Sequence, residues 1–399
     1  MAALGDNGMR KANVKVLFAV RRDLYTSPGG DTVQVEETAS ALRRLGVEVT
    51  VSSDPGADLS LFDCVHLYHL ERLHETFPHF LNAERQGKPF VLSPIYWPHD
   101  VGSPNAMSRV WGPPARADRS RPGEVRRSAA DLKNLARLLG TRSAAEHRAI
   151  LLVLRKGWEW CREEILAHAS VVLPNSRSEA EFLPTESARP GRGPRTRRIA
   201  LGGPRLRVVP NAIDPDLCRK VKTRMVAERR SGVLSVGHFD VRKNQMLLIR
   251  ALRKTDVPVT FVGEGRFLQK PYYQWCRLMA GRNFRFLGRL PGEKVLELMC
   301  AAKVHVCPSR FETPGLANLE AAAMGCNLVV PDCPPIREYF RDEVAYFSNE
   351  DATELKASVL KALESSPPPG LAERVLETYT WDAVARETLA AYEDAIRGR

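Results

Sequence analysis

The 399-residue sequence lacks any apolar run long enough to cross a membrane, and its start lacks the apolar core of a signal peptide. A membrane-spanning helix needs roughly 20 apolar residues, whereas runs such as residues 150–154 are far shorter. Residues 14–20 form the first apolar stretch, but Lys15 lies inside it, so the stretch predicts a strand. We therefore expect a cytoplasmic protein.

Paired cysteines are also absent. The eight cysteines lie singly, with no C-x-x-C pair and no histidine at the spacing of a zinc site. Disulfide scaffolds are typical of short secreted chains. We therefore expect reduced thiols, and the sequence predicts no metal and no bound cofactor.

No residue class dominates the composition. Hydrophobic residues make up 44% and charged residues 27% of the chain, which excludes a collagen-like, coiled-coil or largely disordered protein. At roughly 150 residues per domain, the length favours two or three domains.

Acidic residues are nearly missing from two Pro- and Gly-containing stretches. Residues 109–127 hold six arginines against two acids, and residues 188–207 hold seven arginines and no acid. Most of the net charge of +12 therefore lies there. Two interpretations stay open: solvated loops, or docking on an anionic membrane or a lipid-linked phosphate acceptor. A nucleic-acid partner is not expected, because the stretches carry no interleaved series of aromatics for base stacking.

Short apolar runs alternate with amphipathic helical stretches in two consecutive sets. This alternation predicts an α/β protein with two Rossmann-like, doubly wound domains that face each other across a cleft. The predicted strands are residues 14–20, 47–52, 64–68, 89–93, 171–174 and 205–210, then 232–236, 257–262, 284–287, 304–308, 327–331 and 344–347. Predicted helices include residues 32–45, one long helix over 144–168, and a C-terminal helix from residue 381. We place the domains at residues 1–208 and 209–380.

Candidate ligand-binding residues follow several of these strands. Gly29 and Gly30 stand between the first strand and a helix, where backbone amides can approach a phosphate. Gly263 ends a strand of the second set. Residues 237–243, which include His238, Arg242 and Lys243, follow another strand; cations at the start of a helix oppose its dipole, which hints at a binding role.

The most informative segment follows the strand at residues 304–308. Glu312 lies in the loop, and Glu320 lies eight positions later in a helix of small apolar residues. Carboxylates accept hydrogen bonds well from paired sugar hydroxyls. The amides of Gly315 and Leu316 are placed to face an anion, whereas Pro314 has no amide hydrogen.

Glu312 and Glu320, followed by the residues Ala-Ala-Ala-Met-Gly, resemble the E-x7-E signature of the group-one retaining glycosyltransferases of GT-B fold. Residues 209–214, 236–243, 261–265 and 286–288 are similar to further motifs of that family. Residues 379–382 resemble the start of its terminal helix, which implies that residues 381–399 cross back to the N-terminal domain.

The resemblance implies a hexosyltransferase-type enzyme that moves a sugar from a nucleotide-sugar donor to an acceptor hydroxyl, without metal. It implies that Glu320 holds the ribose and that Glu312 contacts the donor sugar. Lys243 would stabilise the departing diphosphate. Gly29 and Gly30 would approach from the other domain.

The resemblance also implies which residues together bind the donor. The implied donor-binding set is Gly29, Gly30, His238, Arg242, Lys243, Gly263, Glu312, Gly315, Leu316 and Glu320. His238 stands where the family has arginine, and Arg242 is the candidate that supplies the missing guanidinium.

His99 is the candidate catalytic histidine, displaced from the family position; a surface-loop histidine is the alternative.

Two other functions also stay open at this point. One is a sugar-nucleotide epimerase or hydrolase of the same fold, and the other is a nucleic-acid-binding protein that uses the arginine-rich stretches.

Overall fold

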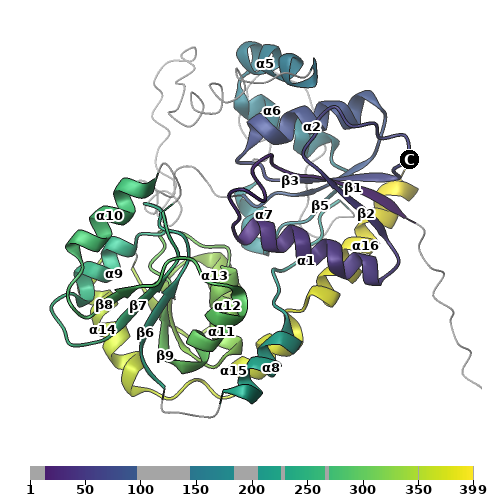
Figure 1. The fold of residues 1–399 in the computed structure, drawn as a ribbon. Coiled ribbons are helices and arrows are strands. Elements are labelled where there is room, and N and C mark those ends of the chain that lie inside the picture. The colour runs from purple at the N-terminus through teal and green to yellow at the C-terminus, as the bar shows by residue number, and fades with distance from the viewer. Residues whose placement is uncertain are drawn as a thin grey trace, which may run out of the picture.

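The computed structural model describes residues 14–96, 144–183, 205–225, 230–265, 269–348 and 350–398. These residues form two parallel sheets with helices on both faces, which confirms the predicted α/β architecture (Figure 1). In the first sheet the strand order is β2-β1-β3-β4-β5, and in the second it is β11-β10-β9-β6-β7-β8.

The first unit contains β1 (Lys15–Ala19), α1 (Gly30–Arg44), β2 (Glu48–Ser52), β3 (Cys64–Tyr68), α2 (Leu73–Arg85), β4 (Phe90–Ser93), α5 (Ala144–Lys156), α6 (Trp158–His168), β5 (Val171–Val172) and α7 (Arg177–Phe182). Helices cover both faces of this sheet, so its central strands carry apolar residues on both sides. In β3 all five residues are buried.

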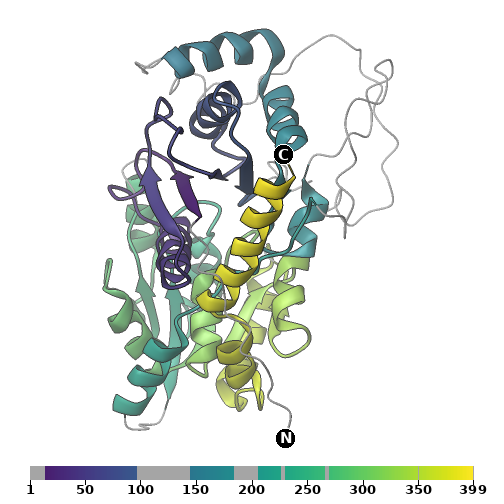
Figure 2. The same ribbon diagram turned by 90° about the vertical axis from the view of Figure 1, so that its right-hand side faces the viewer.

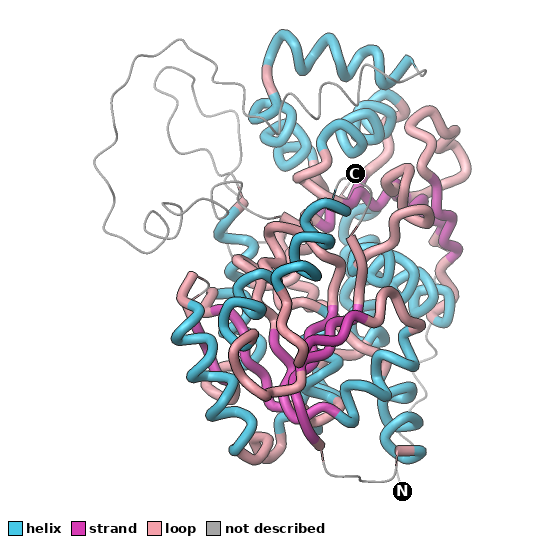
Figure 3. The backbone as a smooth tube through the Cα atoms, turned by 60° about the vertical axis from the view of Figure 1, so that its left-hand side comes forward, coloured by secondary structure: helices cyan, strands magenta, loops and turns pink. Residues whose placement is uncertain are grey.

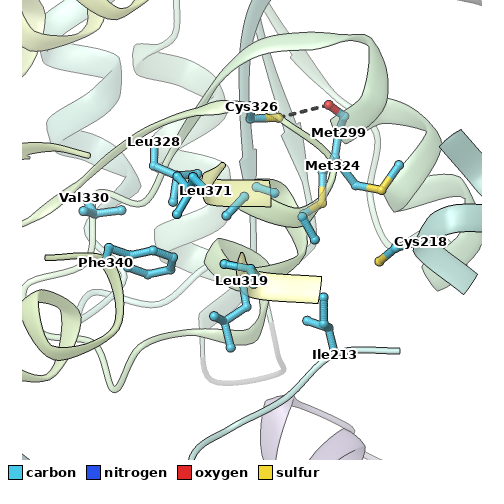
Figure 4. Close-up of a cluster of buried hydrophobic side chains, with 14 of the residues drawn as sticks. Ile213, Cys218, Met299, Leu319, Met324, Cys326, Leu328, Val330, Phe340 and Leu371 are labelled. Atoms are coloured by element: carbon cyan, nitrogen blue, oxygen red, sulfur yellow. Dashed lines mark hydrogen bonds between the residues drawn. The ribbon is translucent and has the colours of Figure 1, made fainter. Parts of the chain in front are cut away.

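The second unit begins with α8 (Pro215–Arg224), β6 (Ser231–Val236), α9 (Gln245–Leu252), β7 (Val259–Val262), α10 (Lys270–Met279), β8 (Phe284–Phe286), α11 (Gly292–Ala301) and β9 (Ala302–Val306). It continues with α12 (Leu316–Ala323), β10 (Asn327–Pro331), α13 (Pro334–Phe340), β11 (Ala345–Phe347), α14 (Ala352–Glu364) and α15 (Leu371–Thr378). On one side of its sheet, Leu319, Leu328, Val330, Phe340 and Leu371 pack into a buried cluster (Figure 4).

Two predicted elements are wrong. The helix predicted over residues 144–168 is two helices, because Gly157 adopts φ 84° and ψ 165° between α5 and α6, a conformation that side-chain-bearing residues rarely take. The strand predicted over residues 205–210 is reduced to one bridge between Leu206 and Val172. In addition, α1 begins at Gly30, two residues before the predicted start.

The last helix, α16 (Trp381–Arg397), packs against α1 and lies beside β3, β4 and β5 of the first unit (Figure 2). The Tyr392 hydroxyl lies 2.6 Å from Nδ1 of His66 in β3, and the Nε2 atom of His66 lies 2.9 Å from Ser93 Oγ. Burial lowers the pKa of His66 to about 3, so its imidazole is neutral at pH 7. The ranges 1–208, 209–380 and 381–399 for the two domains and this helix stay a prediction.

Polar contacts also join the two units at α13. The carboxylate of Glu338 accepts hydrogen bonds from the backbone amides of Arg177 and Ser178, at 2.8 and 3.1 Å. The Tyr339 hydroxyl donates to the carbonyl of Asn175 at 2.6 Å and accepts from the amide of Asn211 at 2.8 Å. These bonds hold the second unit against the start of α7.

Replacing Tyr392 with Phe should lower the free energy of unfolding by about 1–3 kcal/mol, because a ring nitrogen of the buried His66 loses its close partner. Urea denaturation measures the difference. Tyr346→Phe is the control, since its hydroxyl bonds the Arg341 carbonyl at an exposed position where water can replace it. Equal stability of Tyr392→Phe and wild type would mean that this bond does not help to hold α16.

Candidate functional site

A cavity of about 800 Å³ lies between the two units. Its walls include segments that follow β1, β6, β7, β8 and β9. These segments lie at the carboxyl ends of parallel strands, where open sheets of this kind bind ligands. The structure brings most of the predicted site residues together in this lining: Gly29, Gly30, His238, Lys243, Gly263, Glu312, Gly315, Leu316 and Glu320.

The first unit contributes the loop between β1 and α1, with Gly29 and Gly30 at its end. Gly29 is the N-cap of α1, and its amide donates to the hydroxyl of Thr32 at 3.0 Å. A Cβ atom on Gly30 would lie 3.7 Å from Cδ1 of Leu316, so a side chain as small as alanine would close the space between the two walls here. The loop therefore faces the second unit across a short gap.

A buried arginine holds this loop in place. The guanidinium of Arg21 donates to the Asp31 carboxylate at 2.5 Å, to the Asp23 carboxylate at 2.7 Å and to the Ser27 carbonyl at 2.9 Å. Burial acts to raise the pKa of Asp31, but its contacts with His69 and Arg21 outweigh that effect and lower the pKa well below its usual range. The loop is thus anchored by an ionised network beneath it.

Lys243 and Glu312 form an ion pair in the wall of the second unit. Their Nζ and Oε2 atoms are 2.5 Å apart, and Glu312 is only 6% exposed. Burial acts to lower the pKa of Lys243, but the adjacent Glu312 carboxylate outweighs it, so the pKa of Lys243 is raised. Ser309 Oγ also donates to Glu312 at 3.2 Å. Lys243 is therefore a fixed cation at the cavity wall.

The turn from Glu312 into α12 requires glycine. Gly315 has φ +79°, and a Cβ atom there would lie 2.9 Å from Cγ of Glu312. Below the turn, His305 Nε2 lies 3.1 Å from Asn318 Oδ1, while Asn318 Nδ2 donates to the Pro314 carbonyl at 2.6 Å. This buried chain holds the turn that brings Gly315 and Leu316, at the start of α12, into the cavity lining. The start of a helix is a common place for an anion to bind.

Gly263 allows two strand ends to approach. It adopts φ +130°, and a Cβ atom would lie 2.0 Å from the carbonyl oxygen of Gly237, a position that no side chain can occupy. The loops after β6 and β7 therefore meet directly at the cavity.

Glu320 lies one turn into α12, half-buried at the cavity wall. Burial alone raises the pKa of Glu320 to about 7. A carboxylate that is poorly solvated gains strongly from a ligand hydroxyl that donates to it.

Two predicted site residues are not brought into the described lining. The side chain of Arg242 is 57% exposed and lies 3.4 Å from Asp240 and 3.6 Å from Glu71, which belongs to the first unit. His99 lies outside the described residues. The roles predicted for both residues stay predictions.

The arginine-rich stretches are largely beyond the described part of the chain. Residues 109–127 lie outside the described residues, and so do residues 188–204. Arg205 donates to the Ala167 carbonyl at 3.1 Å. Arg207 pairs with Glu387 at 2.8 Å and Asp394 at 3.1 Å, so these two arginines serve contacts within the molecule.

Sequence reasoning missed several polar residues of the cavity, namely Thr26, Ser27, Ser235, Gln245, Glu264, Lys270, Arg289, Cys307, Ser309 and Asn318. A signal existed for Arg289, because it directly follows Gly288, which comes two residues after the end of β8. Thr26 and Ser27 carried no signal, since their position depends on the Arg21 network.

Within the described residues, no group of three or more His, Cys, Asp or Glu side chains is arranged to hold a metal ion. In the same part of the chain, no helix has both the length and the apolar character needed to cross a membrane.

Glu320→Gln should raise the free energy of unfolding by about 1–3 kcal/mol at pH 8 and leave it nearly unchanged at pH 4. The pKa of this carboxyl rises from 4.5 to about 7 on folding, so the stability it contributes is present below pH 4.5 and is lost as the pH rises to about 7. Glutamine cannot ionise and avoids this loss. Urea denaturation of wild type and variant at the two pH values measures this difference in the free energy of unfolding. An equal difference at both pH values would contradict the raised pKa of Glu320.

Part of this chain is similar in sequence to known proteins. Residues 222–377 match the family model described as "Glycosyl transferases group 1". A curated relative, alpha-maltose-1-phosphate synthase of Mycolicibacterium smegmatis, is 35% identical over 116 residues, which are 26% of this chain and 30% of that protein. The matched region thus spans less than a third of the relative's length.

Solved structures resemble the whole chain. Sucrose-phosphate synthase from Thermosynechococcus elongatus has a TM-score of 0.66 at 14% identity, covering 97% of this chain and 100% of that one. Anabaena HepE in complex with UDP and glucose has a TM-score of 0.60 at 16% identity, covering 96% and 100%. The fold is therefore the GT-B fold.

Proposed function

We propose that this chain, whose residues 222–377 belong to the group 1 glycosyl transferases, transfers a sugar from a nucleotide-sugar donor to an acceptor hydroxyl with retention of configuration. One observation carries the proposal. The Lys243–Glu312 ion pair lines the same cavity as Gly29 and Gly30 of the first unit, so a cation and the start of α1 border one space.

The donor occupies this cavity with its ribose at Glu320 and its diphosphate at Lys243. The half-buried Glu320 carboxylate accepts hydrogen bonds from the two ribose hydroxyls. The amides at the start of α12, at Gly315 and Leu316, lie near sugar and phosphate, and Gly29 and Gly30 approach from the first unit. HepE, a structural neighbour, is described in complex with UDP and glucose.

In the transfer step, the acceptor oxygen bonds to the anomeric carbon on the same face from which the diphosphate oxygen departs, so the configuration is retained. The acceptor hydroxyl passes its proton to that departing oxygen, on which negative charge grows as its bond to carbon breaks. Lys243, already held as a cation by Glu312, stabilises that growing charge without a metal ion. Glu312 contacts the donor sugar, and His99 keeps its predicted catalytic role within this proposal.

The acceptor binds on the side of the first unit and is anionic or lipid-linked. Two similar proteins are named for phosphorylated products, alpha-maltose-1-phosphate synthase and sucrose-phosphate synthase. The excess of arginine over acid in residues 109–127 and 188–207 supports an anionic acceptor or a membrane surface.

A panel of nucleoside-diphosphate sugars, offered with and without sugar phosphates, tests the proposal through the nucleotide that is released. Release of the nucleotide should require an acceptor. Calorimetry should show that the Glu320→Gln variant binds the accepted donor about tenfold more weakly, because the variant has lost a charged hydrogen-bond acceptor. Glu373→Gln, on the exposed face of α15, is the control.

Three outcomes of the panel would count against this function. Equal release without acceptor would indicate a hydrolase, and conversion of the sugar without transfer would indicate an epimerase. If no donor bound, the assignment of the cavity would be wrong.

Lys243→Ala should lower kcat by roughly 10²–10³ and change the KM for the donor much less, because the diphosphate charge grows in the transition state. Steady-state kinetics with the accepted donor separates the two constants. Lys294→Ala removes an exposed lysine that pairs with Glu297 at 2.7 Å, and it should leave both constants unchanged. A rise in KM alone would make Lys243 a residue of ground-state binding.

A further inference from the structure

The outer face of α5 exposes leucines that the core does not use. Leu151 is 69% exposed and Leu154 is 49% exposed, whereas Ala149 and Val153 of the same helix are buried. The helix packs against α2 and α6 through its inner side. Most of Leu151 and about half of Leu154 therefore lie outside the packing of the first unit.

The sequence of α5 explains why this exposure cannot be avoided. Residues 150–154 are all apolar, and five helical residues cover more than one turn, which takes about 3.6 residues. A helix that packs on one side can bury only part of such a run. Leu151 and Leu154 are the members of this run that stay exposed.

Cations surround these leucines. Arg148, Leu151 and Arg155 are spaced i, i+3 and i+7, so they share one side of the helix, and Leu154 lies next to them. Lys156 is also exposed, and its Nζ atom lies 5.8 Å from the ring centroid of Trp160. The acidic residue of α5, Glu146, is buried and pairs with Arg22. The outer face thus carries positive charge only.

The position of α5 leaves this face accessible among the described elements. The helix lies at the end of the first unit that is farthest from the second sheet, with α2 and α6 on its inner side (Figures 1 and 3). It is remote from the donor cavity, whose lining includes no residue of α5. A surface bound here would leave the cavity open.

We propose that the outer face of α5, formed by Arg148, Leu151, Leu154, Arg155 and Lys156, docks on an anionic lipid bilayer. The leucines enter the boundary between headgroups and acyl chains, while the cations bind lipid phosphates, as in amphipathic helices that lie in a membrane surface. The positive charge of the face favours anionic lipid as its partner. A second copy of the chain is disfavoured, because two such faces would bring like charges together. The inference concerns a surface outside the site and does not depend on the proposed function.

Co-sedimentation with phosphatidylcholine vesicles, with and without phosphatidylglycerol, tests this surface on the full chain. Wild type should bind only the anionic vesicles. Raising the salt from about 0.1 M to about 1 M, which shortens the Debye length from about 10 Å to about 3 Å, should weaken binding. Leu151→Ser with Leu154→Ser, and separately Arg148→Gln with Arg155→Gln and Lys156→Gln, should each lower the partition coefficient about tenfold or more.

Matched variants on the second unit are the controls. Leu278→Ser removes a leucine that is 82% exposed on α10, and Arg250→Gln with Arg253→Gln and Lys254→Gln removes two arginines and a lysine that are exposed around the end of α9. Both should bind like wild type, and all variants should unfold at the wild-type temperature.

Three results would overturn the proposal. The first is that wild type does not bind anionic vesicles, and the second is that the α5 variants bind them as strongly as wild type. The third is an oligomer in solution that the leucine substitutions dissociate, which would make the face a contact between copies.

Discussion

The ion pair between Lys243 and Glu312 is the contact on which the site depends. The two residues are 69 positions apart in sequence and 2.5 Å apart in space, because β6 and β9 are neighbours in the sheet and the loops after them leave the same edge. Glu312 keeps the lysine charged in a place where burial alone would favour the neutral amine. The cavity therefore contains a fixed positive charge before any ligand enters.

The backbone around this pair is as constrained as the pair itself. Gly315 and Gly263 leave no room for a side chain, because a Cβ atom would lie 2.9 Å from Cγ of Glu312 at the first and 2.0 Å from the Gly237 carbonyl oxygen at the second. On the opposite wall, the buried Arg21 holds the loop of Gly29 and Gly30 through Asp31. Both walls are thus set by contacts within the protein, which reduces the reorganisation that binding a charged ligand would need.

Glu320 shows how stability and binding oppose each other at such a site. Burial raises the pKa of its carboxyl to about 7, which costs folding stability at neutral pH. The same loss of solvation makes a hydroxyl donor more valuable to the carboxylate once a ligand is bound. Strained or poorly solvated groups of this kind are expected where a protein binds its ligand.

Local pattern alone determined the alternation of strands and helices, the motif residues after strand ends and the position of Glu320 in a helix, because these depend on neighbours within a few residues. It failed at Gly157, where a helix of continuous amphipathic pattern breaks, and at residues 205–210, where the predicted strand is reduced to one bridge between Leu206 and Val172. Only the tertiary structure decided that Arg242 reaches Glu71 of the first unit, outside the cavity lining, and that Leu151 and Leu154 face outward. Which side of a helix is covered, and which charge meets which, depends on segments distant in sequence, and periodicity carries no information about them.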